Sequence, residues 1–335
     1  MPIPRLNRKF LRFSLRGFLL VTTLFAILLG REVNRARVQA MSAEHVRKLG
    51  GGVSYDFQFV AAGTTIKPSR GYLTSIYYVD DCYIESARHP VPDWLQKYVD
   101  ENLFVRVERV SIETRMGDIG FLAGFPDLRE LSLCSSTLVD ADLRVLAKLK
   151  NLRKLKIQSA NITGAGLRHL EGCRRLEELS LSGSGVTSVG IKAVTLPTSL
   201  RKVDFAWTDI DDAGLIVLEP LKNLESLLLG QTNVAGPGLR FLSNHPKLER
   251  LRLDQTKIGD SPSLSALAAL PNLKYLSLQS CRMSDDGIVY LKELSQLEVL
   301  KMPWIRDDSI SVAAARELDV ALMTTSVEYP HARFW

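Results

Sequence analysis

The stretch Leu224–Leu242, LESLLLGQTNVAGPGLRFL, combines two hydrophobic periods in a short span. Its first half places Leu227 and Leu229 at alternate positions, as in a strand with one buried face. Its second half places Leu239 and Leu242 at a helical spacing. The glycine-containing segment AGPG separates the two halves and breaks the strand. The stretch therefore predicts a short strand, a turn and a short helix.

This pattern recurs along the chain with a period of 24 residues and one step of 25. The leucines that open successive units are Leu128, Leu152, Leu176, Leu200, Leu224, Leu248, Leu273 and Leu297. One such unit cannot close its own core, so neighbouring units must stack and bury their apolar columns against each other. We therefore expect the fourth position of every unit to be buried, namely Leu131, Leu155, Leu179, Val203, Leu227, Leu251, Leu276 and Leu300.

Units such as LRELSLCSSTL, residues 128–138, resemble the leucine-rich-repeat family, whose pattern is LxxLxLxx(N/T/C)x(I/L). The resemblance covers about two thirds of the chain. It implies an α/β solenoid that is curved, with a parallel sheet on the concave face and short helices on the convex face. It also implies that ligands are recognised on the concave face, although the fold does not identify the partner.

The strand register predicts which side chains line this concave face. Third and fifth positions of each unit point away from the core. Their charges alternate in sign along the repeats, which gives a polyanion no continuous basic track, so we expect no nucleic acid and a protein partner. Hot spots of protein interfaces favour Trp, Tyr and Arg. The predicted partner-binding residues are Trp207, Leu228, Arg252, Tyr275 and Trp304.

The positive charge of the chain is concentrated at its N-terminus. Residues 1–48 hold ten Lys and Arg against two Glu, so the rest carries about −2 of the total of +6. The segment 17–30 has no charged residue, and 10–30 is long enough to span a bilayer if Arg12 and Arg16 reach back to the headgroups. This predicts a single-pass N-terminal anchor. A cleaved signal peptide and an interfacial helix are the alternatives.

The excess of basic residues before the apolar stretch predicts that the N-terminus lies in the cytoplasm and the repeats on the extracytoplasmic side. We expect three parts: 1–48, a membrane anchor with a juxtamembrane helix; 49–106, a small α+β N-terminal cap; and 107–335, the repeat solenoid. The order of helix, GGG at 50–52, strand and PDWL at 92–95 resembles the N-terminal region of bacterial membrane-anchored leucine-rich-repeat proteins.

Aspartates recur just before the predicted convex helices. Asp140, Asp212, Asp260 and Asp285 share one register, with Gly164 and Ser188 in the same place in other units. Aspartate is a favoured helix N-cap, so we expect these side chains to cap the helices that follow them.

Catalytic and metal chemistry find no support in the residue spacing. The four cysteines and five histidines are scattered without a ligand pair, so we expect no metal, no cofactor and no enzyme. One alternative is an F-box-like substrate receptor of a ubiquitin ligase, whose helical F-box the segment before the repeats does not match. Another is an enzyme with its site in residues 50–106, where Asp80, Asp81, Glu85 and His89 lie close together.

Overall fold

The computed structural model describes residues 15–55, 59–60, 82–83, 106–113, 118–260, 262–303 and 310–329. The chain divides into two compact units, one formed by residues 1–44 and 56–106, the other by 45–55 and 107–335. This division falls inside the first helix, α1 (Leu15–Lys48). The domain boundaries expected at residues 48 and 106 remain predictions.

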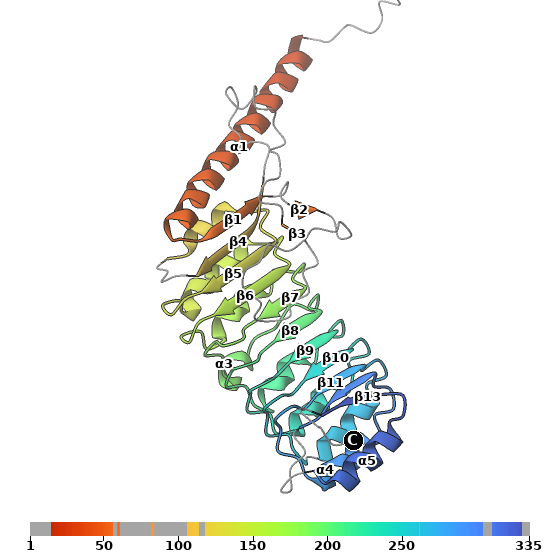
Figure 1. Cartoon of the computed structure of the whole chain (residues 1–335). Helices are drawn as coiled ribbons and strands as arrows, with labels where there is room; N and C mark the ends of the chain where they lie inside the picture. The colour runs from red at the N-terminus through yellow and green to blue at the C-terminus, as the bar shows by residue number, and fades with distance from the viewer. Residues whose placement is uncertain are drawn as a thin grey trace, which may run out of the picture. The chain divides into compact units, whose positions relative to one another are not determined.

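The second unit is built on one sheet of 11 strands. Figure 1 shows its repeat strands stacked in chain order. The first strand, β1, pairs antiparallel with β4, and the later neighbours pair in parallel. The strands are β1 (Gly52–Tyr55), β4 (Val107–Glu113), β5 (Glu130–Cys134), β6 (Lys154–Gln158), β7 (Glu178–Ser180), β8 (Lys202–Asp204), β9 (Ser226–Leu228), β10 (Arg250–Arg252), β11 (Tyr275–Ser277), β12 (Val299–Lys301) and β13 (Ser326–Glu328).

Short helices return the chain from one strand to the next, as the repeat pattern predicts. Most are 3₁₀ helices, because only a few residues of each unit remain for the return and the tighter 3₁₀ turn suits short pieces. They are η4 (Gly120–Gly124), η5 (Asp140–Lys148), η6 (Ala165–Leu170), η7 (Gly214–Leu218), η8 (Pro237–Leu242) and η9 (Pro262–Ala269), with the α-helices α3 (Ser188–Ile191), α4 (Asp285–Leu291) and α5 (Val312–Ala321).

The core lies between the sheet and these helices, and its register confirms the predicted fourth column. Each of the eight residues of that column is at most 2% exposed. Neighbours pair in register, so that Leu227 lies between Val203 and Leu251. Burying one such leucine side chain stabilises the fold by about 1.5–3 kcal/mol. The solenoid is therefore held by apolar columns that run through all the repeats.

The N-terminal region departs from the expectation of a membrane-spanning helix. Although α1 is 34 residues long, no helix within the described ranges combines the length and the apolarity needed to cross a membrane. The predicted transmembrane helix is therefore unsupported. Residues 10–14 of the expected span lie outside the described residues.

The segment predicted as an α+β cap is described only in short pieces. Its strand β1 adds to the edge of the repeat sheet through β4, so this strand continues the sheet. In the first unit, β2 (Phe59–Val60) and β3 (Cys82–Tyr83) form a separate antiparallel pair. The PDWL segment at 92–95 and the cluster of Asp80, Asp81, Glu85 and His89 lie outside the described residues.

Candidate functional site on the open face of the sheet

In the described part of the chain, the repeat helices lie on one face of the repeat sheet (Figure 1), and we call the opposite face the open face. The pairing confirms the predicted columns on it. The third column is Glu130, Lys154, Glu178, Lys202, Ser226, Arg250, Tyr275 and Val299. The fifth column is Ser132, Lys156, Ser180, Asp204, Leu228, Arg252, Ser277 and Lys301. Most of these side chains are partly or fully exposed, whereas Asp204 and Ser277 are buried.

Opposite charges pair across the strands in the first half of the open face. The ammonium group of Lys154 lies 3.6 Å from the carboxylate of Glu130, which also pairs with Arg109. One strand pair further on, Lys202 lies 2.9 Å from Glu178. Exposed pairs of this kind contribute about 0–1 kcal/mol each. Their main effect is to neutralise this part of the surface.

Apolar side chains are exposed in the middle of the open face. Leu228 on β9 is partly exposed, and Trp207, at the rim after β8, is 62% exposed. The backbone of Trp207 is left-handed, with φ of 60°, and its N–H donates to the carbonyl of Gly230 at 2.9 Å. Equivalent residues of other repeats, such as Gln231 and Gln255, are also left-handed. The turn itself therefore requires this conformation, and it holds the indole at the rim.

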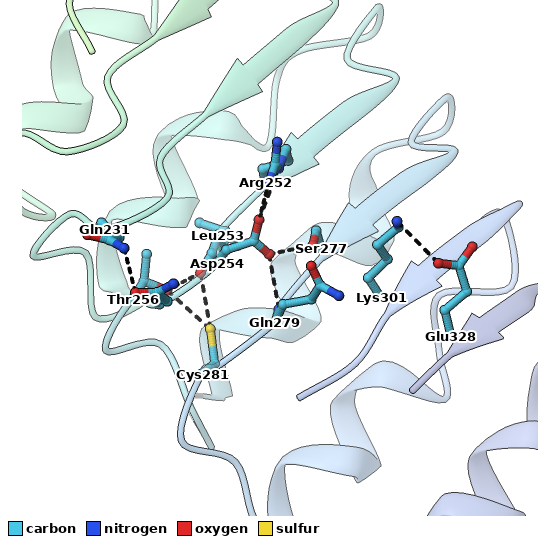
Figure 2. Close-up of polar contacts among 11 residues, drawn as sticks. Gln231, Arg252, Leu253, Asp254, Thr256, Ser277, Gln279, Cys281, Lys301 and Glu328 are labelled. Atoms are coloured by element: carbon cyan, nitrogen blue, oxygen red, sulfur yellow. Dashed lines mark hydrogen bonds and ion pairs between the residues drawn. The ribbon is translucent and has the colours of Figure 1, made fainter. Parts of the chain in front are cut away.

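A buried carboxylate organises the next part of the open face (Figure 2). Asp254 is 8% exposed, and its Oδ2 accepts hydrogen bonds from Nε and Nη2 of Arg252 at 2.9 and 2.8 Å. Its Oδ1 accepts from the N–H of Gln279 at 3.0 Å and from the hydroxyl of Ser277. The network fixes the guanidinium group of Arg252 on the surface. We did not expect this role of Asp254, although an Arg and an Asp two positions apart on a strand share one face.

Cations also flank the ring of Tyr275 on β11. The guanidinium carbon of Arg250 lies 5.4 Å and the ammonium nitrogen of Lys301 lies 5.9 Å from the ring centroid, within the range of cation–π attraction. Lys301 also lies 3.2 Å from Glu328, and this hydrogen-bonded carboxylate raises the pKa of the Lys301 amine. This end of the open face therefore presents an aromatic ring between positive groups.

Another acid of the open face, Asp204, is buried behind its neighbours. It is 9% exposed and accepts hydrogen bonds from the N–H of Ala206 at 3.0 Å and the hydroxyl of Ser180 at 3.1 Å. Burial raises the pKa of Asp204, and this effect outweighs the hydrogen bonds and the positive charges of Lys156 and Arg252. Its carboxylate oxygens are thus engaged by Ala206 and Ser180 beneath the accessible surface.

The aspartates predicted as helix caps form caps of a different kind. Oδ1 of Asp140 accepts from the N–H of Gly166 at 2.8 Å, and its Oδ2 accepts from the N–H of Thr163 at 3.0 Å, both in the next repeat. Asp212 and Asp260 reach forward in the same way to Gly238 and Ser284. The expectation that each caps its own helix was wrong, because stacking places the next helix start beside the side chain.

The convex side holds a groove of about 340 Å³ between successive helices. It is lined by Lys192, Asp212, Ala213, Ile216, Pro237, Gly238, Arg240 and Phe241. Trp207, Leu228, Arg252 and Tyr275 do not line it. Its one acid, Asp212, is already engaged by backbone N–H groups of the next repeat.

Four of the five predicted residues lie on or beside the open face. Leu228, Arg252 and Tyr275 stand in its columns and Trp207 stands at its rim. Trp304 lies outside the described residues. Within the described part of the chain, no group of three or more His, Cys, Asp or Glu side chains is placed to hold a metal ion.

Comparison with known proteins agrees with the repeat assignment. The family model described as Leucine Rich repeat matches residues 197–218 and 269–292. The sequence matches no curated protein. The repeats of this chain are leucine-rich repeats, as the periodic leucines and the strand register also show.

Solved structures similar to this chain include two internalins of Listeria monocytogenes. One, an internalin (inlF), is 22% identical, with 65% of this chain and 72% of that chain covered and a TM-score of 0.44. The other, internalin C2 (inlC2), is 27% identical, with 50% of this chain and 84% of that chain covered and a TM-score of 0.34.

Proposed function

We propose that this chain is a non-catalytic scaffold that binds a partner protein on the open face of its repeats. One observation carries the proposal. The same strands that bury their fourth column completely present Leu228, Arg252 and Tyr275 on the opposite face, with Trp207 at the rim. Aromatic residues and arginine are enriched at the energetic centres of protein interfaces.

The charge distribution favours a protein partner over a nucleic acid. Phosphate binding depends on cations that are not already neutralised. On the open face Lys154 and Lys202 are paired with Glu130 and Glu178, and these pairs interrupt a basic track along the described strands. A partner surface of mixed charge suits such a face.

The state of the buried nucleophiles and bases supports a non-catalytic role. His245 is 1% exposed, and its ring nitrogens face backbone carbonyl oxygens, with Nδ1 3.0 Å from that of Leu242 and Nε2 2.9 Å from that of Leu218. Burial raises the pKa of the thiols of Cys173 and Cys281. A thiol with a raised pKa is a poor nucleophile, because the thiolate is the reactive form.

We further propose that residues 10–30 tether the chain to a membrane, with the repeats on the extracytoplasmic side. Large apolar side chains of α1 are exposed, among them Leu20 at 72% and Phe25 at 65%. Such a surface is unfavourable in water and marks a site of membrane or protein contact. Arginines before and after the apolar stretch suit the headgroup regions.

The tether is tested by extraction of membranes with alkaline carbonate. We expect the full-length chain to stay in the membrane pellet and the chain without residues 1–44, which keeps the whole of the second unit, to appear in the supernatant. Recovery of the intact full-length chain in the supernatant would refute the tether and leave the binding proposal standing.

The binding face is tested by photo-crosslinking in intact cells. A photoreactive amino acid replaces Leu228 on the open face or, as the control, Val189 on α3, which is 88% exposed on the convex side. We expect position 228 to capture a discrete protein that position 189 does not capture. Capture of the same protein from position 189 alone would move the interface to the convex side and refute the proposal.

A further inference from the structure

We propose that the partner presents to the open face an extended segment in which an acidic residue lies two or four positions from a large apolar residue. This inference rests on the proposed function and specifies the chemistry of the partner. It follows from the order of side chains along the repeats, where an apolar region is followed by cations that face outward.

The apolar region consists of Leu228 and Trp207. Small residues lie in the neighbouring turns, Ala206 in the turn that follows β8 and Gly230 in the turn that follows β9. Trp207 is 62% exposed, and Leu228 is partly exposed. A large apolar side chain of the partner would cover both residues and remove their surface from water, at about 25 cal/mol for each Å².

The cationic region begins on the next strand with Arg252, the in-register neighbour of Leu228. The side chain of Arg252 is 46% exposed, whereas that of Asp254 is 12% exposed, so the positive group faces outward and the acid lies behind it. Asp254 binds Nε and Nη2 of the guanidinium group. Nη1 has no acceptor among the described residues, and a guanidinium held in place loses little entropy when it binds a carboxylate.

A second cation, Lys301, lies two strands beyond Arg252. Its side chain is 30% exposed, and its amine lies over the ring of Tyr275 and beside Glu328. Both cations already have a carboxylate partner, but Arg252 is the more exposed, at 46% against 30%, and its Nη1 makes no bond to Asp254, so Arg252 is the principal carboxylate site and Lys301 the secondary one. Among the acids of this part of the open face, Asp204 and Asp254 are buried, whereas the side chain of Glu328 is 49% exposed and pairs with Lys301.

The spacing follows from strand geometry. Neighbouring strands lie about 4.8 Å apart, so Leu228 is about 5 Å from the strand of Arg252 and about 14 Å from that of Lys301. An extended segment that crosses the strands advances about 3.3 Å per residue, and alternate side chains share one face. Residues two and four positions apart on that face are separated by about 7 and 13 Å. A carboxylate two positions from the apolar residue therefore meets Arg252, and one four positions away meets Lys301.

The test uses phage-displayed random dodecapeptides selected against the full-length chain in detergent. Selected peptides are then synthesised with a photoreactive group, and their affinity is measured by fluorescence anisotropy. We expect enrichment of Asp or Glu at two or four positions from an apolar residue, with crosslinks to the open face. Arg252→Gln should weaken binding at least tenfold. Lys156→Gln, which removes a cation from the same column four strands earlier, should leave affinity within twofold.

The outcomes separate this inference from the proposed function. Crosslinks to the open face by peptides without that acidic position, or unchanged affinity of Arg252→Gln, would refute the inference and leave the function standing. Crosslinks confined to the convex side, or no enrichment of any peptide, would count against both. Because Arg252→Gln leaves Asp254 without its cation, its fold is checked by thermal melting. Lys301→Gln gives a second test of the same site. We expect it to lower affinity severalfold for peptides whose acidic residue lies four positions from the apolar residue.

Discussion

The carboxylate of Asp212 accepts a hydrogen bond of 2.7 Å from the backbone N–H of Gly238, which belongs to the next repeat. Its Oδ1 also accepts from the N–H of Gly236 at 3.0 Å, and its Oδ2 from that of Ala235 at 3.0 Å. One side chain thus satisfies three N–H groups at the start of η8. The cap connects two repeats, so it stabilises their stacking as well as the helix.

Removing this cap should destabilise the solenoid. For Asp212→Ala we expect a loss of about 2 kcal/mol in the free energy of unfolding, because caps contribute about 0.5–2 kcal/mol and hydrogen bonds to charged groups about 1.5–3 kcal/mol. Urea denaturation followed by circular dichroism measures the loss. Asp209→Ala, an exposed aspartate of the same repeat, is the control and should change stability by no more than about 0.5 kcal/mol. Equal losses would contradict the inter-repeat cap.

The same kind of cap at Asp140 should make stability depend on pH. Burial tends to raise the pKa of Asp140, but hydrogen bonds from Gly166, Thr163 and Gly164 outweigh it and lower the pKa below the ordinary 3.8. A lowered folded pKa stabilises the protein above the unfolded pKa, and this contribution is lost as the pH falls through the folded value. The stability difference between the wild type and Asp140→Asn should be constant above about pH 5 and shrink below 3.8. A difference that grows on acidification would show that the sign is wrong.

Close approach of the repeats makes Gly238 intolerant of a side chain. A Cβ atom there would lie 2.7 Å from both Cα and the carbonyl oxygen of Asp212. We expect Gly238→Ala to destabilise by about 1–3 kcal/mol, the usual range for overpacking. Gly230→Ala is the matched control, since its Cβ would lie 3.4 Å from the nearest atom, the carbonyl oxygen of Asp254. Differential scanning calorimetry of both variants makes the comparison, and a larger loss from Gly230→Ala would contradict it.

Adjacent leucines of β9 should differ in their contribution to stability. Leu227 is 0% exposed, and Leu227→Ala should cost about 2–5 kcal/mol. Leu228 is partly exposed on the open face, so Leu228→Ala should cost less than about 1 kcal/mol. Chemical denaturation of the two variants gives the values. A larger loss from Leu228→Ala would mean that the two sheet faces are reversed.

Trp207 offers a way to separate stability from binding. A left-handed conformation costs a residue with a side chain about 1–2 kcal/mol, and glycine avoids this cost. Glycine destabilises the folded state by about 0.5–1 kcal/mol in return, because it makes the unfolded chain more flexible. For Trp207→Gly we expect a net gain in stability of about 0.5 kcal/mol. Affinity for the partner captured through position 228 should fall, because the indole is lost.

Trp207→Ala keeps the left-handed cost and should lower affinity without the gain in stability. Thermal melts and a binding titration with both variants distinguish the two effects. Unchanged affinity in both would remove Trp207 from the binding surface.

The sequence by itself determined the repeats, the buried column and the side chains of the open face. These follow from periodicity, because a period of two fixes the sheet face of every residue once one leucine column is buried. Leu227, Leu228 and Arg252 lie on the faces that this rule predicts. The transmembrane helix was also predicted from composition alone, and the described residues do not support it.

Only the tertiary structure decided which groups meet between repeats. Asp212 was expected to cap its own helix, yet it binds Gly238 of the next repeat. Asp254 emerged as the buried partner of Arg252, and Trp207 as left-handed. A one-dimensional period specifies the face on which a side chain lies. The lateral offset of stacked repeats determines its hydrogen-bond partner, and that offset is set by how the cores of neighbouring units pack together.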